Sequence, residues 1–304
     1  MAVLDAFNEA LERRDLDATL ALFVRHPDVT LVGSEEGETA TGPSELHSFF
    51  ERIFGGEWEV ILADNGSRYG TVAVAQRWAE RLPLRIVSVG GPPDAGRARN
   101  AGAAAARADL LAFCDGDDEV SPGWRGALLE ALRDAPLVTG PIDCRRLNSA
   151  RAAKALDGVM PSGPEWLPRV TAGGNVAVRR AVLEAVGGFP EDYGRGEDTA
   201  FGWSVQLAGY PLAVAPAALV YYRLKGDSRR AMFQRFYRYG RASVKHYRSF
   251  RERGMPRSPA RDVVYDWATI PLNFLRGRSY FAAQMAGCRV GRLVGSARSR
   301  ILYL

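Results

Sequence analysis

Three carboxylates follow one short apolar run, and their types and spacing suggest metal chemistry. Residues 110–113 are continuously apolar, and Asp115, Asp117 and Asp118 come within the next five positions. Like charges packed this closely repel one another unless a cation neutralises them. Hard divalent ions prefer carboxylate oxygens, and magnesium or manganese keeps positions open for water and phosphate oxygens. The pattern suits either a divalent metal site or an acidic turn that caps the helix expected after Ser121.

Two further acidic positions could take part in a reaction at such a site. Glu197 and Asp198 are adjacent, and Asp64 and Asn65 directly follow the apolar run 60–63. A carboxylate within hydrogen-bond reach of a hydroxyl can remove its proton and make the oxygen nucleophilic. The plainer alternatives are a helix cap for the first pair and a turn for the second.

These residues need a scaffold, and the sequence predicts alternating strands and helices from about residue 58. The predicted strands are 60–63, 84–89 and 110–113, and the predicted helices are 71–81, 95–107 and one opened by Ser121 and Pro122, with proline at its first position. Such alternation implies right-handed crossovers and a parallel sheet in an α/β fold. Ligands of these sheets bind beyond the carboxyl ends of the strands, where Asp64 and Asp115 are expected.

Several of these segments, taken in order, resemble motifs of family 2 glycosyltransferases. Segment 60–67 resembles the family's strand with an acidic residue that contacts the nucleotide, and 96–102 resembles its segment near the nucleoside. Segment 113–118 resembles the D-x-D metal motif. Segments 173–175, 186–189 and 196–198 resemble the acceptor-side motifs. The resemblance covers about 57–225 and implies the GT-A fold, a Rossmann-like, mainly parallel sheet with flanking helices.

The resemblance also implies roles for individual residues. It implies a hexosyltransferase that moves a sugar, with inversion, from a UDP- or GDP-linked donor to a glycan, lipid or small-molecule acceptor. Asp198 would be the base with Glu197 beside it, and Asp115 and Asp117 would hold manganese or magnesium. The implied donor contacts are Asp64, Asn65, Arg99, Asn100 and Asp115, and the implied acceptor-side residues are Gly174 and Asn175.

Two departures from the family pattern support an alternative function. The family has a histidine that helps to bind the metal where this chain has Tyr222, and its first strand, which holds the nucleobase, has no counterpart before Asp64. The alternative is a non-catalytic sugar-nucleotide-binding or scaffold protein with the same fold. The acidic residues Asp115, Asp117 and Asp198 favour the enzyme.

Residues 1–56 resemble the opening half of a SnoaL-like cone fold, of the kind that binds small ligands or assembles complexes. Too few residues match to enclose a pocket, so a binding function of this segment ranks last. We expect instead that the strand 29–32 and the helix 44–54 supply the missing first βα unit, with the strand parallel to 60–63. Glu35 and Glu36 would then lie beside Asp64 and weaken donor binding.

The segment 226–304 is predicted to be a helical, basic tail. It holds 17 basic and 4 acidic residues, a net charge of +13 in a chain of +5. In the helix expected over 228–250, Phe233, Phe236 and Tyr237 lie on one face and arginines on the other. The alternatives are a solvated face and an acidic partner, either an anionic lipid surface or a nucleic acid. With the family resemblance we expect a peripheral membrane contact and no nucleic acid.

The remaining composition predicts a cytoplasmic, soluble chain. The apolar fraction of 47% and charged fraction of 25% are those of globular proteins and exclude a disordered or collagen-like chain. No signal peptide is apparent, and arginines interrupt the most apolar stretch, 268–294. The odd number of cysteines, without metal-binding spacing, predicts reduced thiols: Cys114, Cys144 and Cys288.

Overall fold

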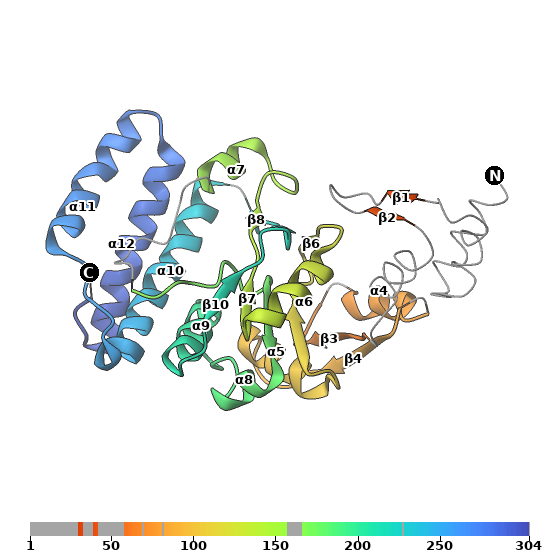
Figure 1. Cartoon of the computed structure of the whole chain (residues 1–304). Helices are drawn as coiled ribbons and strands as arrows, with labels where there is room; N and C mark the ends of the chain where they lie inside the picture. The colour runs from red at the N-terminus through yellow and green to blue at the C-terminus, as the bar shows by residue number, and fades with distance from the viewer. Residues whose placement is uncertain are drawn as a thin grey trace. The chain divides into compact units, whose positions relative to one another are not determined.

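The computed structural model describes residues 30–32, 39–41, 58–68, 70–80, 82–156, 166–226 and 228–303. The chain divides after Glu59 into two units, Met1–Glu59 and Val60–Leu304 (Figure 1).

In the first unit, two short strands form a hairpin. Strand β1 (Thr30–Val32) pairs antiparallel with β2 (Thr39–Thr41). The expected parallel strand at 29–32 is therefore wrong: among the described strands β1 pairs with β2, and the strand at Val60 pairs with another partner. A nearby antiparallel partner closes a much shorter loop than a crossover connection does. The expected helix 44–54, Glu35 and Glu36 lie outside the described residues.

The second unit opens with the predicted parallel pair. Strands β3 (Val60–Asp64) and β4 (Leu84–Ser88) run parallel in register from Val60 opposite Leu84 to Asp64 opposite Ser88. Helices α4 (Thr71–Trp78) and α5 (Ala95–Ala105) follow these strands and end somewhat earlier than predicted. Asp94 caps α5 by accepting a hydrogen bond from the backbone N–H of Arg97.

A four-stranded mixed sheet holds the core of this unit. Its order is β10 (Leu212–Val214), β7 (Leu137–Thr139), β9 (Val176–Arg179) and β5 (Leu110–Phe113). Strand β9 is antiparallel to both neighbours, whereas β10 and β7 are parallel. Alternate residues face opposite sides, so Val138 packs on α6 (Trp124–Asp134) and Leu137 packs on the side of α9 (Glu197–Leu207).

Helix α6 begins later than predicted. Gly123, with φ of 76°, is its N-cap, and Trp124 is its first residue, so Pro122 lies in the preceding turn. The strand β6 (Glu119–Val120) explains the delay, because its pairing with β11 (Val220–Tyr221) keeps the chain extended up to Val120. The same small sheet contains β8 (Ile142–Asp143), and the short helices of the region are α7 (Ala150–Leu156) and α8 (Arg180–Ala185).

Three helices form the C-terminal part of the second unit, as predicted. They are α10 (Arg229–Phe250), α11 (Ala260–Leu275) and α12 (Ser279–Ser299), with a 3-10 turn at Arg251–Arg253. Ser228 caps α10 through its hydroxyl oxygen. In Figure 1 these helices stand together beside the sheet region. Among the described residues, no helix is both long enough and apolar enough to cross a membrane.

Helices α10 and α12 run parallel and touch backbone to backbone. A Cβ on Gly287 would meet the carbonyl oxygen of Phe233, and a Cβ on Gly291 would meet that of Tyr237. Four residues further, one on Gly295 would meet the side chain of Val244. Glycines at every fourth position form one face of a helix, and only residues without a side chain permit this approach.

Candidate active site

Arg99 is the centre of the site. From α5 it donates hydrogen bonds to Oε1 of Glu197 at 2.7 Å and to Oδ1 of Asp115 at 2.8 Å. Its side chain is only 10% exposed. Burial opposes its charge, but the carboxylates of Asp115, Glu197 and Asp198 outweigh burial and hold the pKa of the guanidinium above its ordinary value. One cation therefore joins the acidic turn after β5 to the first turn of α9.

The first turn of α9 presents the predicted base. Asp198 accepts hydrogen bonds from the backbone N–H of Gly173 at 2.9 Å and of Thr199 at 2.6 Å. Glu197 beside it is buried, and burial followed by the charge of Asp198 raises the pKa of its carboxyl group. Two carboxylates at a helix N-terminus are favoured by the helix dipole. The left-handed φ of 84° at Gly196 turns the chain into this helix.

Two predicted glycines make room for these contacts. A Cβ on Gly173 would come within 2.7 Å of the guanidinium of Arg99, and one on Gly174 would come within 2.8 Å of the carboxyl carbon of Asp115. Real Cβ atoms do not approach so closely, so any larger residue would displace the two charged groups. Gly174, expected on the acceptor side, therefore sits against Asp115 of the acidic turn.

The acidic turn is held by several cations. Asp115 accepts from the backbone N–H of Asp118, and Oδ2 of Asp117 pairs with Nζ of Lys225 at 3.1 Å. Oδ1 of Asp118 accepts from the backbone N–H of Arg223 at 2.7 Å, but its Oδ2 is buried without a hydrogen-bond partner. Burial, followed by the charges of Asp115 and Asp117, raises the pKa of Asp118 to about 6 in spite of the opposing bond from Arg223.

This turn fits a cation in part. The described residues hold no group of three or more histidine, cysteine or acidic side chains around a common point. The pairs above engage one carboxylate oxygen each of Asp115 and Asp117, and Oδ2 of Asp118 is a buried acceptor without a donor. A magnesium or manganese ion bound here would take most of its ligands from water and phosphate oxygens, as these ions commonly do.

The end of β3 is organised mainly by Asn65. Its side chain donates to the carbonyl of Val89 at 3.0 Å and accepts from the backbone N–H of Asp94 at 2.6 Å. Asp64 accepts from the backbone N–H of Ser67 at 3.1 Å. Asn65 therefore joins the loop after β4 to the end of β3, and Asp64 stands at the strand end where a ligand of a parallel sheet is expected.

Comparison with known proteins covers the part of the site that contains Asp64, Arg99 and Asp115, and ends before Glu197 and Asp198. Residues 44–187 match the model of glycosyl transferase family 2, and residues 1–75 match that of a SnoaL-like domain. The chain is thus similar to glycosyl transferase family 2 over residues 44–187. Both resemblances predicted from the sequence are thereby confirmed, and the two matched regions share residues 44–75.

Two curated relatives support this similarity. The chain is 30% identical over 165 residues to glycosyltransferase AglE of Haloferax volcanii, which covers 52% of this chain and 54% of AglE. It is 30% identical over 171 residues to succinoglycan biosynthesis protein ExoM of Rhizobium meliloti, which covers 53% of this chain and 55% of ExoM. The chain thus spans about half the length of these curated relatives.

A solved structure confirms the predicted GT-A fold. The mannosyltransferase PcManGT from Pyrobaculum calidifontis, in complex with GDP-Man and Mn²⁺, superposes with a TM-score of 0.51 at 19% identity. The match covers 80% of this chain and 66% of that one. At this identity the likeness concerns the fold.

Two residues of the predicted set serve the scaffold of the protein. Asn175 is fully buried, donates to the carbonyls of Pro141 and Ala218 at 2.8 Å, and accepts from the indole of Trp124. The expectation that Asn175 contacts the acceptor is therefore corrected, because all of its amide atoms are engaged inside the protein.

Asn100 has a similar scaffold role. Its amide exchanges two hydrogen bonds of 2.8 Å with the backbone N–H and C=O of Phe189, and it also donates to Glu191. The side chain expected to contact the donor thus ties α5 to the loop before α9.

Tyr222, which stands where the family has a metal-binding histidine, is not suited to bind a metal in this structure. Burial raises the pKa of Tyr222 to about 12, and its phenol hydrogen-bonds with the side chains of Arg195 and Arg235. A protonated phenol is a poor metal ligand, so Tyr222 does not replace the family's histidine. It instead links the segment before Asp198 to α10.

Sequence reasoning did not foresee the contact between α10 and Gly196, the residue that precedes α9. Nε2 of His246 lies 2.8 Å from the carbonyl oxygen of Gly196, and its ring packs against Trp203 and Tyr193. Burial lowers the pKa of His246 to about 4, so the neutral ring donates this hydrogen bond. The one signal in the sequence is a lone histidine on a buried helix face, which more often marks packing than a site.

Proposed function

We propose that this chain transfers a sugar, with inversion, from a nucleotide-linked donor to an acceptor hydroxyl. One observation carries the proposal: Arg99 holds the acidic turn of Asp115 and the α9 turn of Glu197 and Asp198 in a single site. A transferase needs the leaving diphosphate and the incoming hydroxyl on either side of one sugar carbon. The two acidic segments supply groups suited to each side.

The proposed chemistry assigns the base to Asp198. Its carboxylate takes the proton of the acceptor hydroxyl, the oxygen forms a bond to the anomeric carbon, and the bond from that carbon to the diphosphate breaks. The nucleoside diphosphate leaves with the electron pair. A divalent ion held by Asp115 and Asp117 would supply Lewis-acid stabilisation of the leaving diphosphate. Asp64 and Arg99, at the edge of this site, are proposed to position the nucleotide.

A non-catalytic function remains the second candidate because of two observations. Tyr222 stands where the family has a metal-binding histidine, and Lys225 occupies an oxygen of Asp117 at 3.1 Å. A protein with these features could bind a sugar nucleotide and turn it over slowly. Measured turnover separates this candidate from the enzyme.

The first test is a nucleotide screen of the full chain. Thermal unfolding is followed with UDP, GDP and their sugar derivatives, each with manganese and with a chelator. GDP-mannose deserves priority because PcManGT was solved with that donor and Mn²⁺. A melting temperature that rises with one nucleotide only when manganese is present supports the donor site. No rise with any nucleotide contradicts it.

We also propose that the chain associates with anionic membranes, through a surface other than the one expected. Phe236 is buried inside the protein, and Phe233 and Tyr237 lie where α12 packs against α10. The apolar face of α10 is therefore covered by the protein itself and cannot dock on lipid.

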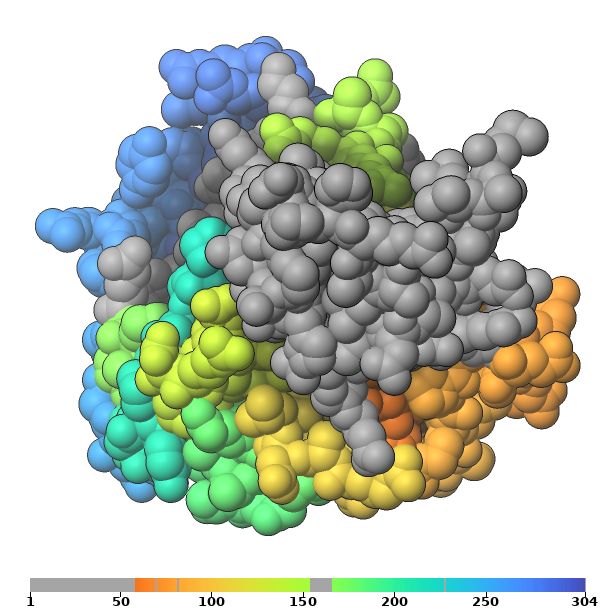
Figure 2. Space-filling model, turned by 45° about the vertical axis from the view of Figure 1, so that its right-hand side comes forward, coloured from red at the N-terminus to blue at the C-terminus, as the bar shows by residue number. Residues whose placement is uncertain are grey.

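Helix α11 provides the exposed apolar surface instead. Val264, Tyr265, Phe274 and Leu275 are each at least 60% exposed, and Trp267 is 40% exposed. Figure 2 shows the C-terminal helices, in blue, at the surface of the molecule. Arginines flank the helix: Arg261, Arg276 and Arg278. Exposed aromatic and aliphatic residues with flanking positive charge are typical of a helix that lies in the plane of an anionic membrane surface.

A further inference from the structure

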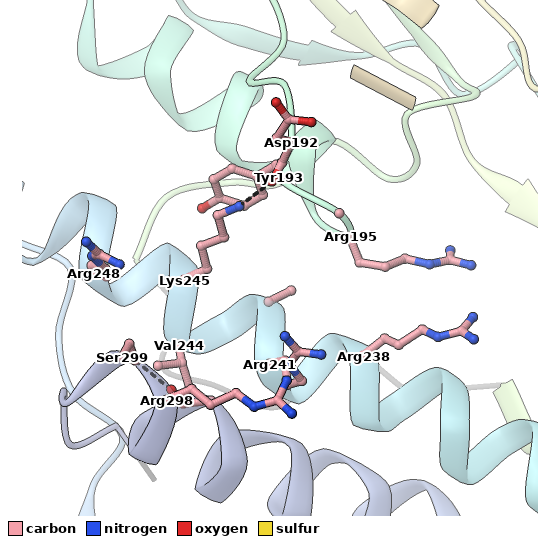
Figure 3. A pocket seen from close by; sticks show the side chains of 13 residues that line it. Asp192, Tyr193, Arg195, Arg238, Arg241, Val244, Lys245, Arg248, Arg298 and Ser299 are labelled. Carbon is pink, nitrogen blue, oxygen red and sulfur yellow. Dashed lines mark hydrogen bonds between the residues drawn. The ribbon is translucent and has the colours of Figure 1, made fainter. Parts of the chain in front are cut away.

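A basic cavity lies beside the proposed catalytic base. Its volume is about 600 Å³, and it is bounded by the loop Asp192 to Arg195, by α10 and by the end of α12 (Figure 3). Six of its 13 lining residues are basic: Arg195, Arg238, Arg241, Lys245, Arg248 and Arg298. One lining residue, Asp192, is acidic.

The positive charge of this cavity is largely uncompensated. Oδ1 of Asp192 pairs with Arg97 at 2.8 Å, so the carboxylate is already engaged outside the cavity. No carboxylate of the described residues forms an ion pair with the four exposed arginines of α10 and α12. These are Arg238, Arg241, Arg248 and Arg298. Like charges gathered without counterions repel one another, which an anion in the cavity would relieve.

Lys245 joins α10 to the loop that forms the opposite wall of the cavity. Its Nζ donates to the backbone carbonyl of Asp192 at 2.8 Å and lies 4.2 Å from the ring centre of Tyr193. Burial, together with the charges of Arg248 and Arg241, lowers the pKa of its ammonium group below the ordinary value. In Figure 3 the side chains of Arg195 and Arg238 extend in the same direction from opposite walls.

We propose that this cavity binds the phosphate or diphosphate group of an anionic acceptor substrate. Guanidinium groups match phosphate oxygens through paired N–H donors, and several of them around one space suit a group with two or more negative charges. A carboxylate would engage one or two of these donors and leave the others unpaired. The cavity is large enough for a diphosphate and part of the group that it carries.

The position of the cavity separates its ligand from the donor. Arg195 lies three positions before Asp198, and His246 of α10 bonds Gly196 between them. The acidic turn with Asp115, where the donor diphosphate is proposed to bind, belongs instead to the end of β5. The anion therefore belongs to the acceptor. This inference rests on the proposed function only in identifying the anion as the acceptor's.

Binding of pyrophosphate to the full chain tests the inference. Calorimetry with a chelator present removes metal-dependent binding at the donor site. Arg238→Gln/Arg241→Gln removes two positive charges from the cavity wall, and its pyrophosphate affinity should fall about tenfold or more. Arg229→Gln/Arg230→Gln removes the same charge from exposed positions of the same helix outside the cavity, and its affinity should stay close to that of the parent. Arg298→Gln, on α12, should reproduce part of the loss if the double variant is unstable.

The source of the phosphate is settled by comparing pyrophosphate with farnesyl diphosphate below its aggregation concentration. Tighter binding of farnesyl diphosphate by about tenfold, lost in the cavity variant, supports a lipid-linked acceptor. Equal binding of the two supports a phosphorylated soluble acceptor. Pyrophosphate binding that is the same in the parent and the cavity variant overturns the inference.

Nucleotide binding keeps the two proposals distinguishable. UDP or GDP with manganese should bind the cavity variant as it binds the parent. If the parent binds neither nucleotide but the cavity variant still loses pyrophosphate, the donor proposal fails and the anion site stands.

Discussion

Arg99 and Glu197 form an ion pair of 2.7 Å in the protein interior, although 98 positions separate them in the sequence. Because the same guanidinium also binds Asp115, it is the shared counterion of two acidic segments. Removing it would leave the buried carboxylate of Glu197 without a positive partner. Loss of one member of a buried charge pair is strongly destabilising.

Arg99→Met should therefore lower the free energy of unfolding by about 3 to 5 kcal/mol. Urea unfolding measures the change. Arg97→Met is the control, because its partners Glu191 and Asp192 are largely exposed and its loss should be smaller. Equal losses in the two variants would show that Arg99 is not a special counterion.

Asp198→Asn should leave donor binding intact and lower turnover by a factor on the order of 100 or more, the range expected for loss of a general base. An amide still accepts one of the backbone bonds from Gly173 or Thr199, so the fold should survive. Steady-state kinetics and nucleotide titration are measured on the same protein. Equal losses of binding and rate would indicate a structural role, and donor hydrolysis without acceptor reports whether the metal side still works.

Asp117→Ala should abolish manganese-dependent nucleotide binding and turnover together, because Asp115 and Asp118 each already have one oxygen engaged, by Arg99 and by the backbone N–H of Arg223. Calorimetric titration with UDP or GDP and manganese gives the answer. Glu119→Ala removes an exposed carboxylate two positions away and should bind as the parent does. Unchanged binding in Asp117→Ala would refute the metal assignment.

Trp267→Ser/Phe274→Ser/Leu275→Ser should abolish binding to vesicles that contain about one third anionic lipid. The substitutions remove three of the exposed apolar side chains of α11 while the arginines near its ends stay. Co-sedimentation at low and high salt measures binding, which should weaken with salt in the parent. Trp78→Ser/Leu129→Ser/Val214→Ser replaces exposed apolar residues elsewhere and should change little. No binding of the parent at low salt would rule out the membrane contact.

His246→Gln should remove a pH dependence of stability. The pKa of His246 is about 4 in the folded protein and near 6.5 when unfolded, so the unfolded state binds more protons between these values. Stability therefore falls as the pH drops from about 6.5 to about 4, by about 3 kcal/mol in all.

The readout for His246 is the difference between two unfolding curves. Asp118, whose pKa is raised to about 6, contributes the opposite slope between its unfolded value and pH 6. Subtracting the variant from the parent at each pH cancels that contribution. A difference that does not vary between pH 4 and 6.5 would contradict the prediction.

Local sequence patterns predicted the elements that form from the composition of their own residues. The apolar runs at 60–63 and 110–113 became β3 and β5, and the helix expected over 228–250 became α10. The acidic segments with Asp115 and Asp198 were predicted to share one site, and Arg99 joins them. Pattern reasoning succeeds here because residues 60–63 and 110–113 are continuously apolar and the acidic turn begins just after the second run.

The remaining features depend on partners that lie far away in the sequence. Ser121 and Pro122 have the composition of a helix start, yet the pairing of β6 with β11 kept that segment extended. Asn175 resembled an acceptor contact because its neighbours did, and only the fold shows its amide enclosed by Pro141 and Ala218.

The tail gives the clearest case of a correct pattern with the wrong partner. The face containing Phe236, Gly240 and Val244 was predicted to be apolar, and it is buried. From the sequence, this apolar face of α10 was expected to contact a membrane, whereas in the structure α12 packs against it. The spacing of Gly287, Gly291 and Gly295 was the available indication of close helix packing.

That glycine face also sets how α12 can move. Sliding α12 along α10 by one residue would bring Cys288 or Arg292 to a position where the structure has no space for a side chain. The glycine contacts therefore permit one register between the two helices. Since His246 of α10 holds Gly196, any tilt of this pair is transmitted mechanically to the turn that carries Asp198.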